Sequence, residues 1–385
     1  MQDRRADTKI PLVISYYANN MGTTDYLLDF LKNKHSPFYY LKHPLPEMKY
    51  DQSTLLFFDG KEEKLVSAHK SSQKFVFKIA RELFLNGWIA LKLSLRGRTR
   101  TIIGFGSMNA ASVAVFRLLG KKIVFWGVDY SPSRFDSGLL NAVYGFTETL
   151  ACKSSNVVIQ PSRLQEVARI KHHSLRTQKS VILPNGIKMR TIGSINKQQS
   201  DTIRFIYIGS ITPQHGILNF LKHLHEVRKR PYVVTIFGDG VDLQKLQRYV
   251  HKYKLEGSVE LKGSMSPSEI ETQIDQYKEQ LIGVAPYVSN PKSHVAFGDS
   301  LKIKEYVNHG MPFIASSAIS IDDELKRFGH IYTTDDQLRD LLEQDLLDLN
   351  LPLEERERYL SPFDWNHLFS KNSSVSSLLL QKGNV

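Results

Sequence analysis

GDSLKIKEYVNHGMPFIAS, residues 298–316, runs from a small polar loop through a helical pattern into an apolar strand. The helical pattern begins after Ser300 and stops at His309-Gly310. Lys302 and Glu305 are three residues apart, and residues at this spacing share one face of a helix. The stretch therefore predicts a loop–helix–strand unit of an α/β domain in which an ammonium and a carboxylate point the same way.

This pair of charges suits the recognition of a nucleotide. The beginning of a helix offers unpaired backbone N–H groups and a partial positive charge, which favour phosphate, and Lys302 would add a full charge there. Glu305 can accept two hydrogen bonds from neighbouring hydroxyls, as on a ribose. The alternative is an ordinary ion pair on a surface helix, which is the commoner case for such a pair in isolation.

The composition is that of a soluble globular protein of two domains. The chain has 385 residues, of which 41% are hydrophobic and 23% charged, and this length suits two cores better than one. Cys152 is the single cysteine, which excludes an intramolecular disulfide and a zinc ribbon and fits a reducing cytoplasm. The sequence predicts no secretory signal, and no apolar run approaches the roughly 20 residues of a membrane span.

The positive charge is concentrated in one segment. The net charge is +12, and residues 61–100 hold ten lysines and arginines against three glutamates. Such a field attracts an anionic partner, which could be a phospholipid surface, a nucleic acid or a phosphorylated substrate. A nucleic acid is disfavoured because the sequence has no recognisable binding module and no interleaved aromatic platform.

Residues 74–100, KFVFKIARELFLNGWIALKLSLRGRTR, form the centre of this basic segment. They mix apolar side chains with lysine and arginine, as in a basic amphipathic helix that lies on anionic lipid. The alternative is a domain helix whose apolar side belongs to the core. We expect a cytoplasmic protein, with peripheral attachment to the inner face of the cell membrane if this segment docks on lipid.

Strand-like and helix-like segments alternate along most of the chain, which predicts α/β layering with parallel sheets. The strands expected in the first half are residues 10–17, 54–58, 101–105, 122–127, 156–160 and 180–184, with helices at 109–119 and 138–152. Those expected in the second half are 203–209, 232–238, 259–263, 280–287, 312–316 and 330–334. We therefore predict a first domain at 1–190, a polar linker at 191–201, a second domain at 202–350 and a C-terminal segment at 351–385.

Two further glycine turns follow strands of the second half. YIGSITPQHGI (207–217) is a strand, a turn and a helix, and Gly209 would permit close approach to a phosphate. FGDGVDLQKL (237–246) repeats the arrangement. Each has a plain alternative, namely a strand-to-helix connection or a tight turn with an aspartate capping the helix.

In combination these segments resemble the retaining glycosyltransferases of family four, which have the GT-B fold of two Rossmann-like, doubly wound domains. The likeness covers most of residues 200–316, and its specific part is K-x-x-E-Y-x-x-x-G-x-P-x-I-x-S, from Lys302 to Ser316. VILPNGI (181–187) is similar to the motif at the end of the first domain. FWGVDYSPSRF (125–135) resembles a segment of members that build bacterial surface polysaccharides, and FDWNHLF (363–369) is similar to the start of the C-terminal helix that returns to the first domain.

The resemblance implies a donor that is a UDP- or GDP-sugar, held by the second domain, and a glycan or lipid-linked acceptor on the first. Lys302 would contact the diphosphate as the main catalytic group, and Glu305 the ribose. Backbone groups near Leu261 and Lys262 would read the base. No metal is expected, because Lys302 and the helix N-terminus would supply the positive charge.

The sequence departs from the family pattern at three positions. Phe297 stands where many relatives have a glutamate, and Ser210 and His215 stand where basic residues are usual. Compensating contacts could come from His294, Asp299 or Ser300, with backbone N–H groups of residues 297–300 around the sugar or the phosphate, and Ser210 remains a candidate residue of the donor site. Each of these has an equally good interpretation as a residue that caps a loop.

In the first half, Gly22 lies in a loop ahead of a helix that this fold brings near the diphosphate. Asp129 follows a strand and either faces the acceptor or caps the turn before Pro132. The leading hypothesis is a retaining transferase of glycan biosynthesis. The alternatives are a nucleotide-sugar epimerase and a degenerate member that binds a sugar nucleotide or glycan as an accessory subunit.

Overall fold

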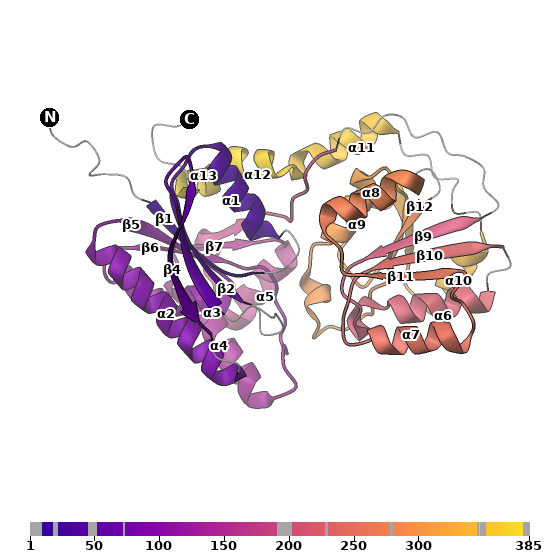
Figure 1. The fold of residues 1–385 in the computed structure, drawn as a ribbon, viewed down its shortest axis with the longest axis horizontal. Helices are drawn as coiled ribbons and strands as arrows, with labels where there is room; N and C mark the ends of the chain where they lie inside the picture. Colours follow the sequence, from indigo (N-terminus) through magenta and orange to yellow (C-terminus); the bar gives the residue numbers. More distant parts are fainter. Residues whose placement is uncertain are drawn as a thin grey trace. The chain divides into compact units, whose positions relative to one another are not determined.

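The computed structural model describes residues 10–17, 22–44, 52–71, 74–190, 202–227, 230–277, 281–344, 346 and 352–379. The chain divides into two compact units (Figure 1). The first contains the chain up to Pro184 and from Trp365 onward, and the second runs from Asn185 to Asp364. The expected linker at 191–201 lies outside the described residues.

The boundaries differ from those expected from the sequence. The first domain was predicted to end at residue 190, but residues 185–190 bond to the second unit: Asn185 N–H donates to Asp299 Oδ2 at 2.8 Å, and Arg190 N–H donates to Asn308 Oδ1 at 3.1 Å. The C-terminal segment was predicted from residue 351, but helix α11 (Leu353–Leu360) also packs in the second unit. The chain rejoins the first unit at Trp365.

The described part of the first unit has a mixed sheet in the order β4-β3-β2-β1-β5-β6-β7-β8. Its strands are β1 (Ile10–Tyr17), β2 (Phe38–Pro44), β3 (Gln52–Phe58), β4 (Glu63–Lys70), β5 (Thr99–Phe105), β6 (Lys122–Trp126), β7 (Val157–Gln160) and β8 (Ser180–Ile182). The β2–β3 and β3–β4 pairs are antiparallel, and the others are parallel.

Strands β2 and β4 were not predicted. Strand β4 is a largely exposed edge strand, so its sequence carries no apolar alternation. Strand β2 is buried between β1 and β3, but the run is short and includes Lys42 and His43. Both strands owe their conformation to partners that are distant in sequence.

Helices cover both faces of this sheet (Figure 1). Val124 and Trp126 of β6 face one core, shared with α1 (Thr23–Asn33), α12 (Trp365–Lys371) and α13 (Ser373–Leu379). The alternate β6 residues Ile123 and Phe125 face the opposite side, as the two-residue period of a strand requires. That side carries α2 (Phe75–Leu95), α3 (Ser107–Ser112), α4 (Gly138–Ser154) and α5 (Arg163–His173).

The expected helix at 109–119 is two pieces. Helix α3 ends at Ser112, and a 3₁₀ turn, η1 (Ala114–Arg117), follows. The Ser112 hydroxyl donates to the Asn109 carbonyl at 2.8 Å, and such a local bond competes with regular helix geometry.

The described part of the second unit has a fully parallel sheet in the order β11-β10-β9-β12-β13-β14. Its strands are β9 (Ile203–Ile208), β10 (Tyr232–Phe237), β11 (Val259–Gly263), β12 (Leu281–Ala285), β13 (Phe313–Ser316) and β14 (Gly329–Tyr332). All six predicted strands are present, with ends that differ by up to two residues.

Helices α6 (Ile217–Val227), α7 (Leu243–Lys252) and α10 (Asp335–Glu343) cover one face of this sheet, and α8 (Pro267–Tyr277), α9 (Leu301–Asn308) and α11 cover the other (Figure 1). The strand order reverses between β9 and β12. Loops that leave the carboxyl ends of two such strands diverge to opposite faces and leave room for a ligand. This switch point is where α9 begins.

Candidate functional site

The loops after β9 and β12 come together at the switch point of the second unit. Val288 N–H donates to the Gln214 carbonyl at 3.0 Å, and the Ser293 hydroxyl donates to Gln214 Oε1 at 3.2 Å. The β12 loop then enters α9, whose first residue is Leu301. The N-terminus of α9 is thereby placed beside the glycine turn that follows β9.

Lys302 places a buried ammonium at this point that no other described residue hydrogen-bonds. Its Nζ is buried and has no hydrogen-bond partner among the described residues. It lies 4.0 Å from the centroid of the Tyr207 ring and 4.9 Å from that of Tyr287. Burial lowers the pKa of Lys302 to about 7. Such an ammonium is in an unfavourable environment until an anion joins it.

The glycine turn gives this ammonium its space. Gly209 has a φ of 142°, a conformation suited to glycine, and a Cβ atom there would lie 3.1 Å from Lys302 Nζ. The neighbouring Gly238 is equally restricted, because a side chain on it would collide with the Gly209 carbonyl. The glycines that the sequence singled out therefore allow the backbone to approach Lys302 closely.

Glu305 does not form an ion pair with Lys302, so the surface ion-pair interpretation is wrong for this helix. Glu305 Oε2 accepts a hydrogen bond from Asn308 Nδ2 at 3.3 Å. Burial raises the pKa of Glu305 to about 7, because the single amide donor offsets little of the lost hydration. The carboxylate thus has acceptor capacity left for a ligand.

Asp299 and Ser300 have structural partners. The Asp299 carboxylate accepts from Lys304 Nζ at 2.6 Å and from Asn185 N–H at 2.8 Å, and Lys304 also donates to the Asn185 carbonyl. Ser300 caps α9 by accepting from Ile303 N–H. The cap interpretation is therefore correct for Ser300, and Asp299 ties the start of α9 to the segment that enters the second unit.

His215 and His294 lie together next to the ammonium. Their ring centroids are 5.9 Å apart, and the Thr212 hydroxyl pairs with His215 Nδ1 at 2.7 Å. Burial, together with the charges of Lys302 and His294, lowers the pKa of His215 to about 3. His215 is therefore neutral at physiological pH and does not replace a basic residue as a charge.

Two other predicted positions lie at the carboxyl ends of β9 and β11, the strands on either side of β10. Ser210 is exposed, and its carbonyl accepts from the Tyr207 hydroxyl at 2.6 Å. Lys262, in β11, directs its ammonium to Glu260 Oε2 at 3.0 Å. The Gly263 carbonyl that follows accepts from Gly238 N–H at 2.8 Å, which joins β11 to the glycine turns.

The first unit has a cavity of its own, of about 630 Å³. It lies at the carboxyl ends of β1, β5 and β6, where ligands bind in sheets of this kind. Its walls include two residues predicted from the sequence, Gly22 and Asp129. Gly22 N–H is bonded to Asp25 Oδ2 at 2.9 Å, so this glycine caps α1.

Glu82 on α2 is the most unusual residue of the cavity wall, and no motif in the sequence singles it out. Its side chain is 2% exposed, and its Oε2 atom has no hydrogen-bond partner among the described residues. Burial raises its pKa to about 7, and the neighbouring Tyr16 hydroxyl and Lys78 ammonium offset only part of this effect. Aromatic side chains, Tyr16, Tyr40 and Tyr144 among them, supply much of the remaining wall.

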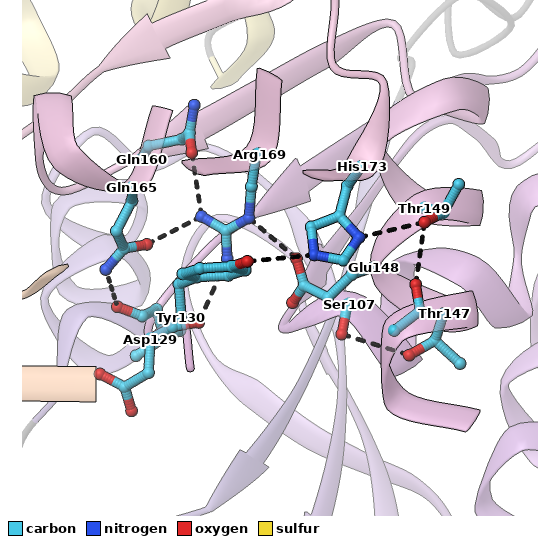
Figure 2. A network of polar contacts seen from close by, with 12 residues as sticks. Ser107, Asp129, Tyr130, Thr147, Glu148, Thr149, Gln160, Gln165, Arg169 and His173 are labelled. Carbon is cyan, nitrogen blue, oxygen red and sulfur yellow. Dashed lines mark hydrogen bonds and ion pairs between the residues drawn. The ribbon is translucent and has the colours of Figure 1, made fainter. Parts of the chain in front are cut away.

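A buried network fixes one wall of this cavity (Figure 2). The Arg169 guanidinium is fully buried and donates to Glu148 Oε2 at 2.9 Å, to Gln160 Oε1 at 2.9 Å and to Gln165 Oε1 at 2.8 Å. It also donates to the Asp129 carbonyl at 3.1 Å, while the Asp129 carboxylate points away from it (Figure 2). Arg169 thereby holds the Asp129 backbone and leaves the carboxylate exposed.

Residues 74–100 were interpreted either as a basic amphipathic helix that lies on lipid or as a domain helix, and α2 has features of both. Leu85, Ile89 and Leu93 pack in the core of the first unit. Phe77, Phe84 and Trp88 are 67%, 73% and 52% exposed. The helix is thus a domain helix that also presents apolar side chains and cations to the outside.

The described residues contain neither a candidate metal centre nor a candidate membrane span. No group of three or more histidine, cysteine, aspartate or glutamate side chains there is placed to hold a metal ion. Among the same residues, no helix has the length and apolar character needed to cross a membrane.

Comparisons with known proteins agree with this architecture. Residues 202–344 match the family model "Glycosyl transferases group 1". No curated protein matches the sequence.

Solved structures resemble the whole chain in fold. The lipopolysaccharide outer core galactosyltransferase WaaB has a TM-score of 0.65 at 14% identity, covering 96% of this chain and 99% of that one. Sucrose-phosphate synthase from Thermosynechococcus elongatus has a TM-score of 0.70 at 13% identity, with the same coverage. Anabaena HepE in complex with UDP-glucose has a TM-score of 0.65 at 12% identity, covering 96% and 98%. The chain therefore has the GT-B fold, and residues 202–344 match the model of the group 1 glycosyl transferases.

Proposed function

We propose that this protein is a retaining glycosyltransferase that moves a sugar from a UDP- or GDP-sugar to a glycan or lipid-linked acceptor. The carrying observation is the buried ammonium of Lys302 at the start of α9, which lies between two tyrosine rings and has no hydrogen-bond partner in the described part of the chain. The match of residues 202–344 to the family model of the group 1 glycosyl transferases supports the reaction class. HepE, one of the structural neighbours, is described in complex with UDP and with UDP-glucose.

The donor would bind with its diphosphate at Lys302 and at the N-terminus of α9. Phosphate oxygens there would accept the hydrogen bonds that the buried ammonium no longer makes to water, and the Gly209 turn would leave room for them. Glu305, three residues further along α9, would accept from the ribose hydroxyls. Backbone groups near Leu261 and Lys262 would contact the base.

In the reaction, the bond from the anomeric carbon to the β-phosphate oxygen breaks, and its electron pair stays on that oxygen. Lys302 and the backbone N–H groups of α9 stabilise this developing charge, so the proposed reaction requires no metal ion. The acceptor oxygen bonds to the anomeric carbon on the face the diphosphate leaves, and its proton passes to the departing phosphate. The anomeric configuration is therefore retained.

The cavity of the first unit is the proposed acceptor site. Its aromatic wall suits the faces of sugar rings, and the free oxygen of Glu82 suits a hydroxyl donor. Asp129, at the same cavity, would contact the acceptor. Helix α2 supplies Lys78 and Glu82 to the cavity wall and also exposes Phe77, Phe84 and Trp88. These exposed aromatic side chains favour an acceptor that is presented at an anionic membrane.

Nucleotide binding is tested first. A thermal-shift panel of UDP, GDP and ADP should separate the bases, because the shift grows with affinity. Lys302→Ala and Glu305→Ala should each remove most of the shift, and the exposed Lys326→Ala should leave it unchanged. A full shift in both site variants would place the nucleotide elsewhere.

Turnover is tested with a labelled nucleotide sugar, with and without a lipid-linked acceptor. Release of the nucleotide diphosphate that depends on acceptor supports transfer. Binding without release in either arm would instead assign the protein to an accessory, sugar-nucleotide-binding role.

A further inference from the structure

A second cavity of about 380 Å³ lies in the first unit, lined by Arg117, Lys153, Ser174, Arg176 and Lys179. Lys179 directly precedes β8, and α4 ends beside it at Ser154. The cavity is therefore at the edge where the parallel strands begin, opposite to the edge that carries the Glu82 cavity. Four of its five lining residues are cations, and none is acidic.

Two of these cations have a structural role. Arg117 donates to the carbonyls of Lys153 and Ser154 at 3.4 and 3.1 Å, and Lys179 donates to the Lys153 carbonyl at 2.8 Å. These carbonyls are at the C-terminus of α4, where cations satisfy free acceptors and the negative end of the helix dipole. Capping explains Arg117 and Lys179.

The Lys153 and Arg176 side chains do not bond to these carbonyls, although Lys153 lies in the last turn of α4. Both are exposed, and neither side chain forms a hydrogen bond or an ion pair with the described residues. Burial and the charges of Arg117 and Arg176 lower the pKa of Lys179. Arg117 and Arg176 thus repel Lys179, and a bound anion would relieve this repulsion.

The cavity adjoins an exposed apolar tip. Leu118 and Leu119 directly follow Arg117 and are 86% and 59% exposed, and Val115 on the same turn is 60% exposed. Residues 83–128 contain seven lysines and arginines and no acidic residue. A site for a free anion needs no exposed leucines, whereas a lipid surface offers both phosphate and hydrocarbon.

We propose that this cavity binds the phosphate headgroup of an anionic lipid, with Leu118 and Leu119 inserted among the acyl chains. Lys153 and Arg176 contact the phosphate, and Ser174 can donate a further hydrogen bond to it. The site is separate from the donor site and does not depend on glycosyl transfer. It would anchor the first unit to a membrane in addition to any docking of α2.

The experiment measures co-sedimentation of the full chain with vesicles of phosphatidylcholine alone or mixed with phosphatidylglycerol. Lys153→Gln/Arg176→Gln removes two cations whose side chains form no hydrogen bond or ion pair with the described residues. Each cation near an anionic surface contributes about fivefold in affinity, so the double variant should bind the mixed vesicles about 30-fold more weakly. Lys34→Gln/Lys61→Gln makes the same charge change at exposed positions of the same unit and should have a much smaller effect.

Leu118→Ser/Leu119→Ser tests the apolar tip and should weaken binding about tenfold or more, because two apolar side chains no longer leave water. Equal effects of the cavity and control pairs would overturn the proposal. A second outcome would also overturn it: the protein does not bind vesicles, but inorganic phosphate raises its melting temperature and Lys153→Gln/Arg176→Gln abolishes this rise. The site would then bind a soluble phosphate. The UDP- or GDP-induced shift should be unchanged in every variant, so a failure here is distinguishable from a failure of the donor site.

Discussion

Replacing Lys302 with methionine should make the empty protein more stable while it removes nucleotide binding. A pKa lowered from 10.5 to about 7 corresponds to about 5 kcal/mol of unfavourable free energy for the charged form in the folded state. Methionine has a similar length and no charge, so it removes this term and retains contact with Tyr207 and Tyr287. We expect a gain of about 2 kcal/mol or more near pH 7, because hydration and relaxation reduce the full value.

The pH dependence provides a second measurement of the same effect. The folded pKa of Lys302 lies below its unfolded value, so the destabilisation is complete below pH 7 and disappears as the pH approaches 10.5. Urea unfolding of the wild type and Lys302→Met from pH 6.5 to 10 should therefore show curves that converge as the pH rises. Nucleotide diphosphate affinity should fall by at least about tenfold in the variant, since a charge-assisted hydrogen bond is lost.

Lys304→Met is the matched control on the same helix. Lys304 is also buried, but it is bonded to Asp299 and to the Asn185 carbonyl. Its loss leaves a half-buried carboxylate without its cation, which should destabilise the protein by about 3 kcal/mol or more. If Lys302→Met were destabilising to the same degree, or if it kept nucleotide affinity, the reasoning about the unpartnered ammonium would be refuted.

Three further predictions concern the other buried charges. Glu305→Gln should weaken UDP or GDP binding about tenfold by calorimetry, but it should not affect analogues that lack both ribose hydroxyls; an equal loss for both ligands contradicts the ribose contact. Glu148→Gln leaves the Arg169 guanidinium buried without a counter-charge and should reduce the free energy of unfolding by about 3 kcal/mol in urea, whereas a loss below about 1 kcal/mol would mean that the pair is dispensable. Burial raises the folded pKa of Glu82 above its unfolded value, so its contribution to the free energy of unfolding is present at acid pH and is lost as the pH rises through 7. Glu82→Gln should therefore have a higher melting temperature than the wild type above pH 7. Melting temperatures that change in parallel with pH in the two proteins would contradict this.

Local patterns predicted most of the regular structure, because a buried parallel strand and an amphipathic helix each carry a periodic signal. All six strands of the second unit and most of those of the first were expected. Strands β2 and β4 were missed because they are formed by pairing with distant strands, and the helix at 109–119 was too long because a local side-chain bond interrupts it. The domain boundary was six residues late because Asn185 is fixed by Asp299, more than a hundred residues away.

The sequence by itself determined that two α/β units are present and that Lys302 and Glu305 share one face of a helix that follows a polar loop. Both are consequences of short-range periodicity. Only the tertiary structure decided that the Lys302 ammonium has no hydrogen-bond partner among the described residues while that of Lys304 is neutralised by Asp299. It also decided that Glu82 and the Arg117–Lys179 cluster line cavities. The free energy of a charged group depends on its partners and its access to water, and both are set by residues that are distant in the chain.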